Sequence, residues 1–129
     1  GTSVIWSPRS NIALYGNTAP VTLLDNMGVK IALGTDWTPS GSMNMVRELR
    51  CADYLNSVHF GSFFTSQQLW RMATDYAAEV LAIDDAVGAL EEGLVADLVI
   101  YHNTEEDYYR NILNARPDDT LLVFLLQIF

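Results

Sequence analysis

Short apolar runs bounded by polar breaks predict strands at two places in the first third of the chain. Residues 29–33 are largely apolar, rich in β-branched side chains and too few for a stable helix, which favours a strand buried on both faces. Residues 2–6 form a similar run that ends at Ser7-Pro8, and Pro8 biases Ser7 away from helix. We therefore expect a second strand that enters a polar loop over residues 7–11.

Helical spacing separates these two strands. A helix is expected from near Thr18 to Gly28, with Pro20 tolerated in its first turn and a buried stripe of Val21, Leu24 and Met27. The order strand, loop, helix, strand predicts a βαβ unit with a right-handed crossover.

Two further helices are expected after a breaker cluster at residues 38–42. The first has a solvent-facing side that carries Arg47, Glu48 and Arg50. Its apolar positions, at helical spacing, are Met43, Val46, Leu49, Ala52 and Leu55. The second begins at a predicted capping box of Thr65 and Gln68. Its apolar face is Leu69, Met72, Ala73, Tyr76, Ala77 and Val80.

The pattern changes near residues 84–87, where helix and strand no longer alternate. The remaining segments predict two short strands, at residues 87–90 and 96–101, on either side of a Glu-Glu-Gly turn. A weak helix is expected at residues 105–113, a turn at residues 116–119 and a last apolar strand at residues 121–129. This change divides the chain into a predicted α/β unit over residues 1–84 and a predicted β-rich unit over residues 85–129.

The composition of the chain excludes some kinds of binding partner and favours one kind of cellular compartment. Half of the 129 residues are apolar, so a hydrophobic core is expected. The net charge of −9 argues against nucleic acid or an anionic membrane as a partner. Cys51 is the only cysteine, which excludes an internal disulfide and suits a reducing compartment. Because no signal-peptide pattern or apolar run of membrane-spanning length is present, the sequence predicts a soluble cytoplasmic protein.

The candidate chemistry lies just past the strand at residues 29–33. Asp36 follows that strand, and in α/β folds the carboxyl end of a strand is where catalytic groups lie. The alternative is that Asp36 only caps a turn or the next helix. Trp6 and Trp37 either line a pocket or pack. His59 and His102 belong to no metal-binding spacing, so each is interpreted as a surface or turn residue.

Three motifs in order resemble the closing part of the metal-dependent amidohydrolase superfamily, in the branch of cytosine and guanine deaminases and triazine chlorohydrolases. They are Trp-Ser-Pro-Arg-Ser-Asn at residues 6–11, Leu-Gly-Thr-Asp at residues 33–36, and Gly-x-Leu-x-x-Gly-x-x-Ala-Asp-Leu-Val at residues 88–99. The resemblance spans about residues 3–101 and implies the last two βα units of a (β/α)8 barrel followed by part of a small β-sandwich, a partial barrel.

The resemblance also implies roles for single residues. Asp36 matches the acid that ends the eighth strand, ligates the catalytic metal (zinc or iron) and exchanges a proton with the attacking water. Asn11 matches the substrate side of the mouth after the seventh strand, and Trp37 replaces the small residue commonly found after the acid. The family's other metal ligands, an HxH pair and histidines on middle strands, have no counterpart in this sequence.

The hypothesis that follows is a C-terminal piece of an amidohydrolase that is inactive alone and binds no metal by itself, because a catalytic zinc uses about three protein ligands. Its expected partner is either a second copy of the chain or a missing N-terminal barrel portion, with a small-molecule substrate in the complete enzyme. Exposed strand edges favour self-association through residues 121–129 or the strand that carries Asp36. The alternative is a non-catalytic oligomeric interaction module derived from such an enzyme.

Overall fold

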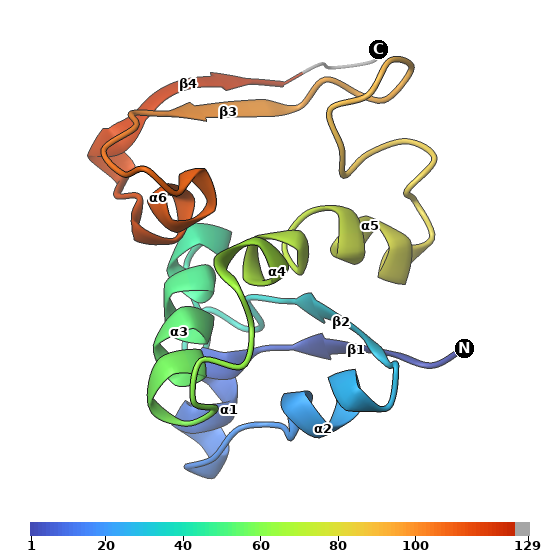
Figure 1. Ribbon diagram of the computed structural model, residues 1–129, viewed down its shortest axis with the longest axis vertical. Coiled ribbons are helices and arrows are strands. Elements are labelled where there is room, and N and C mark those ends of the chain that lie inside the picture. Colours follow the sequence, from blue (N-terminus) through green and yellow to red (C-terminus); the bar gives the residue numbers. More distant parts are fainter. Residues whose placement is uncertain (126–129) are drawn as a thin grey trace.

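The computed structural model describes residues 1–125, and its first part is built on two parallel strands. Strand β1 (Ser3–Trp6) pairs with β2 (Lys30–Leu33) in a register that runs from Ser3 opposite Lys30 to Trp6 opposite Leu33 (Figure 1). Ile31, Ala32 and Leu33 are all buried, as expected for a strand covered on both faces. The two predicted strands and their parallel relation are confirmed.

The connection between the strands contains two helices, α1 (Pro8–Tyr15) and α2 (Val21–Asn26). The expectation of a loop over residues 7–11 is wrong, because Pro8 occupies the first turn of α1, where its missing N–H costs nothing. Gly16 ends the helix in the left-handed conformation, with φ of +67°. In α2 the expected buried Val21 is confirmed, whereas Met27 follows the last turn and is 69% exposed.

Helix α3 (Met45–Val58) confirms the helix expected after the breaker cluster, with Asn44 as its N-cap. Leu49, Ala52 and Leu55 are buried in the order that the spacing predicts. Met43 lies before the helix and is exposed, so its assignment to the buried face is wrong. The expectation that Glu48 belongs to the solvent-facing side is also wrong, because its side chain is completely buried.

The next expected helix is divided into α4 (Ser66–Arg71) and α5 (Asp75–Leu81). The capping box of Thr65 and Gln68 is confirmed at the start of α4. The break between the helices leaves the carbonyl of Met72 free to accept a 2.7 Å hydrogen bond from the backbone N–H of Leu33. A continuous helix would have used that carbonyl internally, so the break joins this segment to β2.

The last part of the described chain is a two-stranded antiparallel sheet with a helix between its strands. Strand β3 (Leu98–Tyr101) pairs with β4 (Thr120–Phe124), and α6 (Tyr108–Asn114) and a short 3-10 helix, η1 (Pro117–Asp119), connect them. The expectation of a strand at residues 87–90 is wrong, since residues 87–89 form bends, with Gly88 at φ of +104°, and residue 90 belongs to no regular element. Residues 126–129 of the expected last strand lie outside the described residues.

The buried side chains form one cluster, in which α3 and α5 contact β2, α3 packs on α4, and α6 packs on both α3 and α4. Leu113 of α6 belongs to this cluster, and Arg110 of α6 forms an ion pair of 2.6 Å with Asp53 of α3. The helix α6 is thereby attached to the first unit, and the division at residues 84–85 stays a prediction. None of the helices in residues 1–125 is both long enough and apolar enough to cross a membrane.

Candidate functional site

Asp36 lies at the carboxyl end of β2, in the loop that leads to α3. Its φ of +55° places it in the left-handed region, where Asp is better tolerated than most residues. Its side chain is exposed, and only a few non-glycine residues of the described chain share a positive φ. Backbone strain of this kind persists only where the surroundings hold it, and it is concentrated at functional sites.

One serine hydroxyl binds the carboxylate of Asp36, and a second serine lies beside the first. The hydroxyl of Ser10, in α1, donates a hydrogen bond of 2.5 Å to Oδ2 of Asp36 and lies 3.0 Å from the hydroxyl of Ser40. The bond from Ser10, followed by one from the backbone of Trp37, lowers the pKa of Asp36, and these effects exceed the opposing effect of desolvation. Asp36 is therefore an ionised acceptor at neutral pH.

The loop that carries Asp36 is compact because its backbone hydrogen-bonds to itself. The N–H of Ser42 donates to the carbonyl of Thr35 at 3.1 Å, and the N–H of Gly41 donates to the carbonyl of Trp37 at 2.7 Å. A Cβ atom on Gly41 would collide with the carbonyl oxygen of Thr35, so glycine is required for this turn. The loop geometry thus holds Ser40 beside Ser10.

A second set of contacts fixes the start of α1, which carries Ser10. The backbone N–H of Arg9 donates to Oε1 of Glu48 at 3.0 Å, and the Nε of Arg9 donates to the hydroxyl of Ser42 at 2.9 Å. The buried carboxylate of Glu48 therefore caps an otherwise unpaired N–H in the first turn of α1. Its Oε2 has no hydrogen-bond partner among the described residues.

The two residues predicted to contact substrate lie near Asp36 but differ in their surroundings. Asn11 follows Ser10 in α1, and its Oδ1 accepts a 3.3 Å hydrogen bond from the backbone N–H of Ala19. Trp37 follows Asp36 and is 72% exposed. Trp6 is buried and donates to Thr18 at 2.8 Å, so of the two interpretations of this residue packing is the one observed.

The described residues do not form a complete metal site around Asp36. Nowhere in residues 1–125 do three or more His, Cys, Asp or Glu side chains come together in a group that could hold a metal ion. His59 and His102 are exposed, as expected, and the ring of His59 packs against Phe60. A catalytic zinc needs about three protein ligands, so Asp36 by itself does not fit a metal centre.

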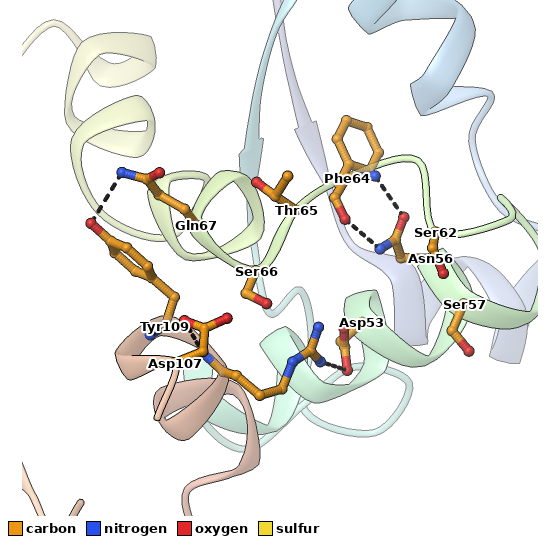
Figure 2. Close-up of a pocket in the computed structure, with 11 residues that line it drawn as sticks. Asp53, Asn56, Ser57, Ser62, Phe64, Thr65, Ser66, Gln67, Asp107 and Tyr109 are labelled. Carbon is orange, nitrogen blue, oxygen red and sulfur yellow. Dashed lines mark hydrogen bonds and ion pairs between the residues drawn. The ribbon is translucent and has the colours of Figure 1, made fainter. Parts of the chain in front are cut away.

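A polar cavity of about 660 Å³ lies elsewhere, between α3, α4 and α6 (Figure 2). The ion pair of Asp53 with Arg110 crosses it, and the amide of Gln67 donates to the hydroxyl of Tyr109 at 3.0 Å. Asn56 holds one wall through two hydrogen bonds with the backbone of Phe64, of 2.8 and 2.9 Å. Among the charged residues that line the cavity, Asp53 pairs with Arg110, and Asp107 accepts hydrogen bonds from backbone N–H groups at the start of α6. These polar contacts attach α6 to α3 and α4.

Sequence reasoning missed the residues that hold Asp36 in place. Ser10 stands beside Asn11 in the motif that carries the resemblance, and this adjacency was the available signal. Ser40 belongs to the breaker cluster at residues 38–42, and because serine is common in loops its presence there indicated no functional role. Glu48 gave a misleading signal, because a charged residue between two arginines on a helix normally faces water.

Comparisons with known proteins identify relatives of this chain. The chain is 36% identical over 104 residues to a 5-methylthioadenosine/S-adenosylhomocysteine deaminase from Desulforudis audaxviator, a match that covers 78% of this chain and 24% of that enzyme. It is 35% identical over 115 residues to a deaminase of the same name from Carboxydothermus hydrogenoformans, covering 85% of this chain and 26% of that one. The chain thus spans about a quarter of the length of these curated relatives.

Solved structures show the same likeness in three dimensions. An adenosine deaminase from Xanthomonas campestris, with bound zinc, superposes with a TM-score of 0.80 at 26% identity, over 95% of this chain and 30% of that one. Guanine deaminase from E. coli superposes with a TM-score of 0.79 over 96% of this chain and 32% of that one, and its 18% identity supports the fold alone. A sequence profile of the amidohydrolase family matches residues 3–121. With nearly the whole chain matched, this protein belongs to the amidohydrolase family.

Proposed function

We propose that this chain is the C-terminal portion of a hydrolase that acts on non-peptide C–N bonds, of the deaminase type. The deaminase names of its relatives and the structural likeness to an adenosine deaminase support this class of reaction. The small share of each relative that the chain covers supports a partial barrel, in which β1 and β2 are the last two barrel strands. The substrate we propose is a small molecule with an amino group on a heteroaromatic ring.

Asp36 carries the proposed chemistry. The observation that supports it is an exposed, ionised carboxylate at the carboxyl end of a parallel strand, held by the buried hydroxyl of Ser10. A carboxylate in this position accepts a proton from the attacking water and delivers it to the leaving nitrogen. Asn11, in α1, and Trp37, in the loop after β2, are proposed to face the substrate.

The complete enzyme is proposed to use zinc or iron, with Asp36 as the one ligand that this chain supplies. Support comes from the zinc in the related adenosine deaminase and from the carboxylate of Asp36, an oxygen donor that zinc accepts. Since residues 1–125 do not complete a metal centre, we propose that the chain binds no metal and is inactive until the remaining barrel is supplied. The single cysteine supports a cytoplasmic location.

Reconstitution tests this proposal. Ammonia release from adenosine and 5-methylthioadenosine is measured for the chain alone and for the chain joined to an N-terminal barrel portion from a relative. We expect activity only in the joined protein, and Asp36→Asn in that protein should lower kcat by about 10²–10⁴-fold. The matched control, Asp118→Asn, removes one exposed carboxylate elsewhere and should leave kcat unchanged. Deamination or a stoichiometric metal in the chain alone, or full activity of the Asp36→Asn variant, would overturn the proposal.

A second candidate is a non-catalytic oligomeric module, and the exposed apolar side chains of the β3–β4 sheet favour it. Val99, Ile100, Leu122 and Val123 are each about half exposed, and a two-stranded sheet alone is marginally stable in water. Association of two copies would cover them. Light scattering of the chain, with and without the N-terminal portion, distinguishes the candidates: an oligomer indifferent to that portion supports the module, whereas a monomer contradicts it.

A further inference from the structure

Three of the seven basic residues in this acidic chain gather at one cleft. The sequence contains seven Lys and Arg against sixteen Asp and Glu, yet Arg9, Arg47 and Arg50 all line a cleft of about 660 Å³ between α1 and α3. No Asp or Glu is among the residues that line it. The cleft therefore carries a local positive charge, although the net charge of the chain is negative.

The spacing of these residues explains why they meet. Arg47 and Arg50 are three positions apart on α3, and Tyr54 lies one further turn along the same face. Arg9 and Ile12 are likewise three positions apart on α1, which packs against α3. The cleft is thus formed by facing rows of side chains from two helices, which hold it more rigidly than a loop would.

None of the three guanidinium groups forms an ion pair with another part of the described chain. Among residues 1–125, the ion pairs use Lys30, Arg71 and Arg110, and none uses the arginines of the cleft. Arg9 donates its Nε to the neutral hydroxyl of Ser42. Guanidinium groups bind carboxylate and phosphate oxygens through paired hydrogen bonds, so the unpaired donors favour a small anion.

The rest of the lining is more apolar than polar. Ile12 and Leu55 supply aliphatic surface from the two helices, and Tyr54 supplies an aromatic ring. Burial raises the pKa of the Cys51 thiol, an effect that the nearby carboxylate of Glu48 adds to and that Arg9 opposes. The thiol is therefore neutral near pH 7 and contributes no negative charge to the cleft.

From this juxtaposition we infer that the cleft between α1 and α3 binds a small organic anion. The carboxylate or phosphate group of the ligand binds Arg9, Arg47 and Arg50, and its apolar part packs against Ile12, Tyr54 and Leu55. Its volume is within the range of small-molecule sites. A long polyanion would be repelled by the net charge of −9, whereas a small anion meets only the local positive charge.

The test titrates the purified protein with phenyl phosphate, benzoate, inorganic phosphate and the neutral benzyl alcohol, with amide NMR shifts as the readout. Binding of phenyl phosphate or benzoate should saturate and should shift the amide resonances of α1 and α3. Whichever of the two binds more tightly shows whether the cleft prefers a phosphate or a carboxylate group. Benzyl alcohol and inorganic phosphate, which each lack one half of the ligand, should bind at least about tenfold more weakly. Affinity should fall as salt concentration rises.

Three variants locate the site. Arg50→Gln should weaken binding about tenfold, the loss expected for one charged hydrogen-bonding partner. Arg116→Gln removes an equal charge from an exposed arginine outside the cleft and should leave binding unchanged. Ala13→Trp keeps every charge and fills the cleft with an indole ring, so it should abolish binding of the aromatic anions. Absence of saturation in the millimolar range, equal losses in Arg50→Gln and Arg116→Gln, or unchanged binding to Ala13→Trp would each overturn the inference.

Discussion

The hydroxyl of Ser10 donates a 2.5 Å hydrogen bond to the carboxylate of Asp36, although the two residues are 26 positions apart in the sequence. This contact joins the first turn of α1 to the loop after β2, and it exists because β1 and β2 run parallel. Helix α1 and the loop after β2 therefore both begin at the same end of the sheet, where the carboxyl ends of parallel strands bring their side chains together.

Removing this hydroxyl should raise the pKa of Asp36. In Ser10→Ala the largest cause of the lowered pKa is lost, while the backbone contribution of Trp37 remains. The measurement is a carboxyl ¹³C NMR titration of Asp36. Ser57→Ala, which deletes an exposed hydroxyl on α3 at the separate cavity between α3, α4 and α6, is the control and should not change the titration. An unchanged pKa in Ser10→Ala would contradict the role of Ser10.

The same contact makes stability depend on pH in one direction. The pKa of Asp36 is lower in the folded than in the unfolded protein, so its ionised form stabilises the fold above the unfolded pKa, and this contribution is lost as pH falls through the folded pKa. The affected window lies below about pH 4. Urea unfolding at several pH values should show a shallower decline through that window in Ser10→Ala than in the wild-type protein.

Glu48 should tolerate an amide but not truncation. Glu48→Gln keeps the carbonyl oxygen that accepts from Arg9 and removes a buried ionisable group, whereas Glu48→Ala leaves that N–H unpaired and creates a cavity. We expect Glu48→Ala to lower the free energy of unfolding by about 2–4 kcal/mol and Glu48→Gln by much less. Urea denaturation measures both. The exposed Glu91→Gln is the control, and equal losses in the two Glu48 variants would contradict the capping role.

Gly41 should be more sensitive to a methyl group than a glycine with free space around it. In Gly41→Ala the new Cβ collides with the carbonyl of Thr35, so we expect a loss of about 1–3 kcal/mol and shifted amide resonances for residues 35–42. Gly61 has φ of +63°, and a Cβ atom added there would meet no other atom within 4 Å. Gly61→Ala should therefore cost only about 1 kcal/mol of backbone strain and leave those resonances in place.

Replacing Asn56 by alanine should destabilise the fold more than replacing most other polar residues. Its side chain is 3% exposed and both donates to and accepts from the backbone of Phe64 across the wall of the cavity (Figure 2). Asn56→Ala leaves a buried N–H and a buried carbonyl unpaired, so we expect the free energy of unfolding to fall by about 2–4 kcal/mol. Denaturant titration checks this value. A loss below that of Ser57→Ala, its neighbour on α3, would show that the two hydrogen bonds contribute little.

The local pattern of the sequence was sufficient for the elements whose signal is short-range. The apolar runs of β1 and β2, the capping box of Thr65 and Gln68, and the buried positions of α3 depend on residues close together in the chain. The position of Asp36 after a parallel strand follows from the same information. The motifs that resemble amidohydrolases also lie within short segments, which is why the family could be inferred before the fold was known.

Only the tertiary structure decided what depends on contacts between distant segments. The break between α4 and α5 follows from the bond of Leu33 to Met72, and the burial of Glu48 follows from its bond to Arg9. The helix at residues 8–15 has little apolar periodicity of its own and is held by α3. Periodicity reports which face of a segment is apolar, but a buried polar group is determined by the partner that folding brings to it.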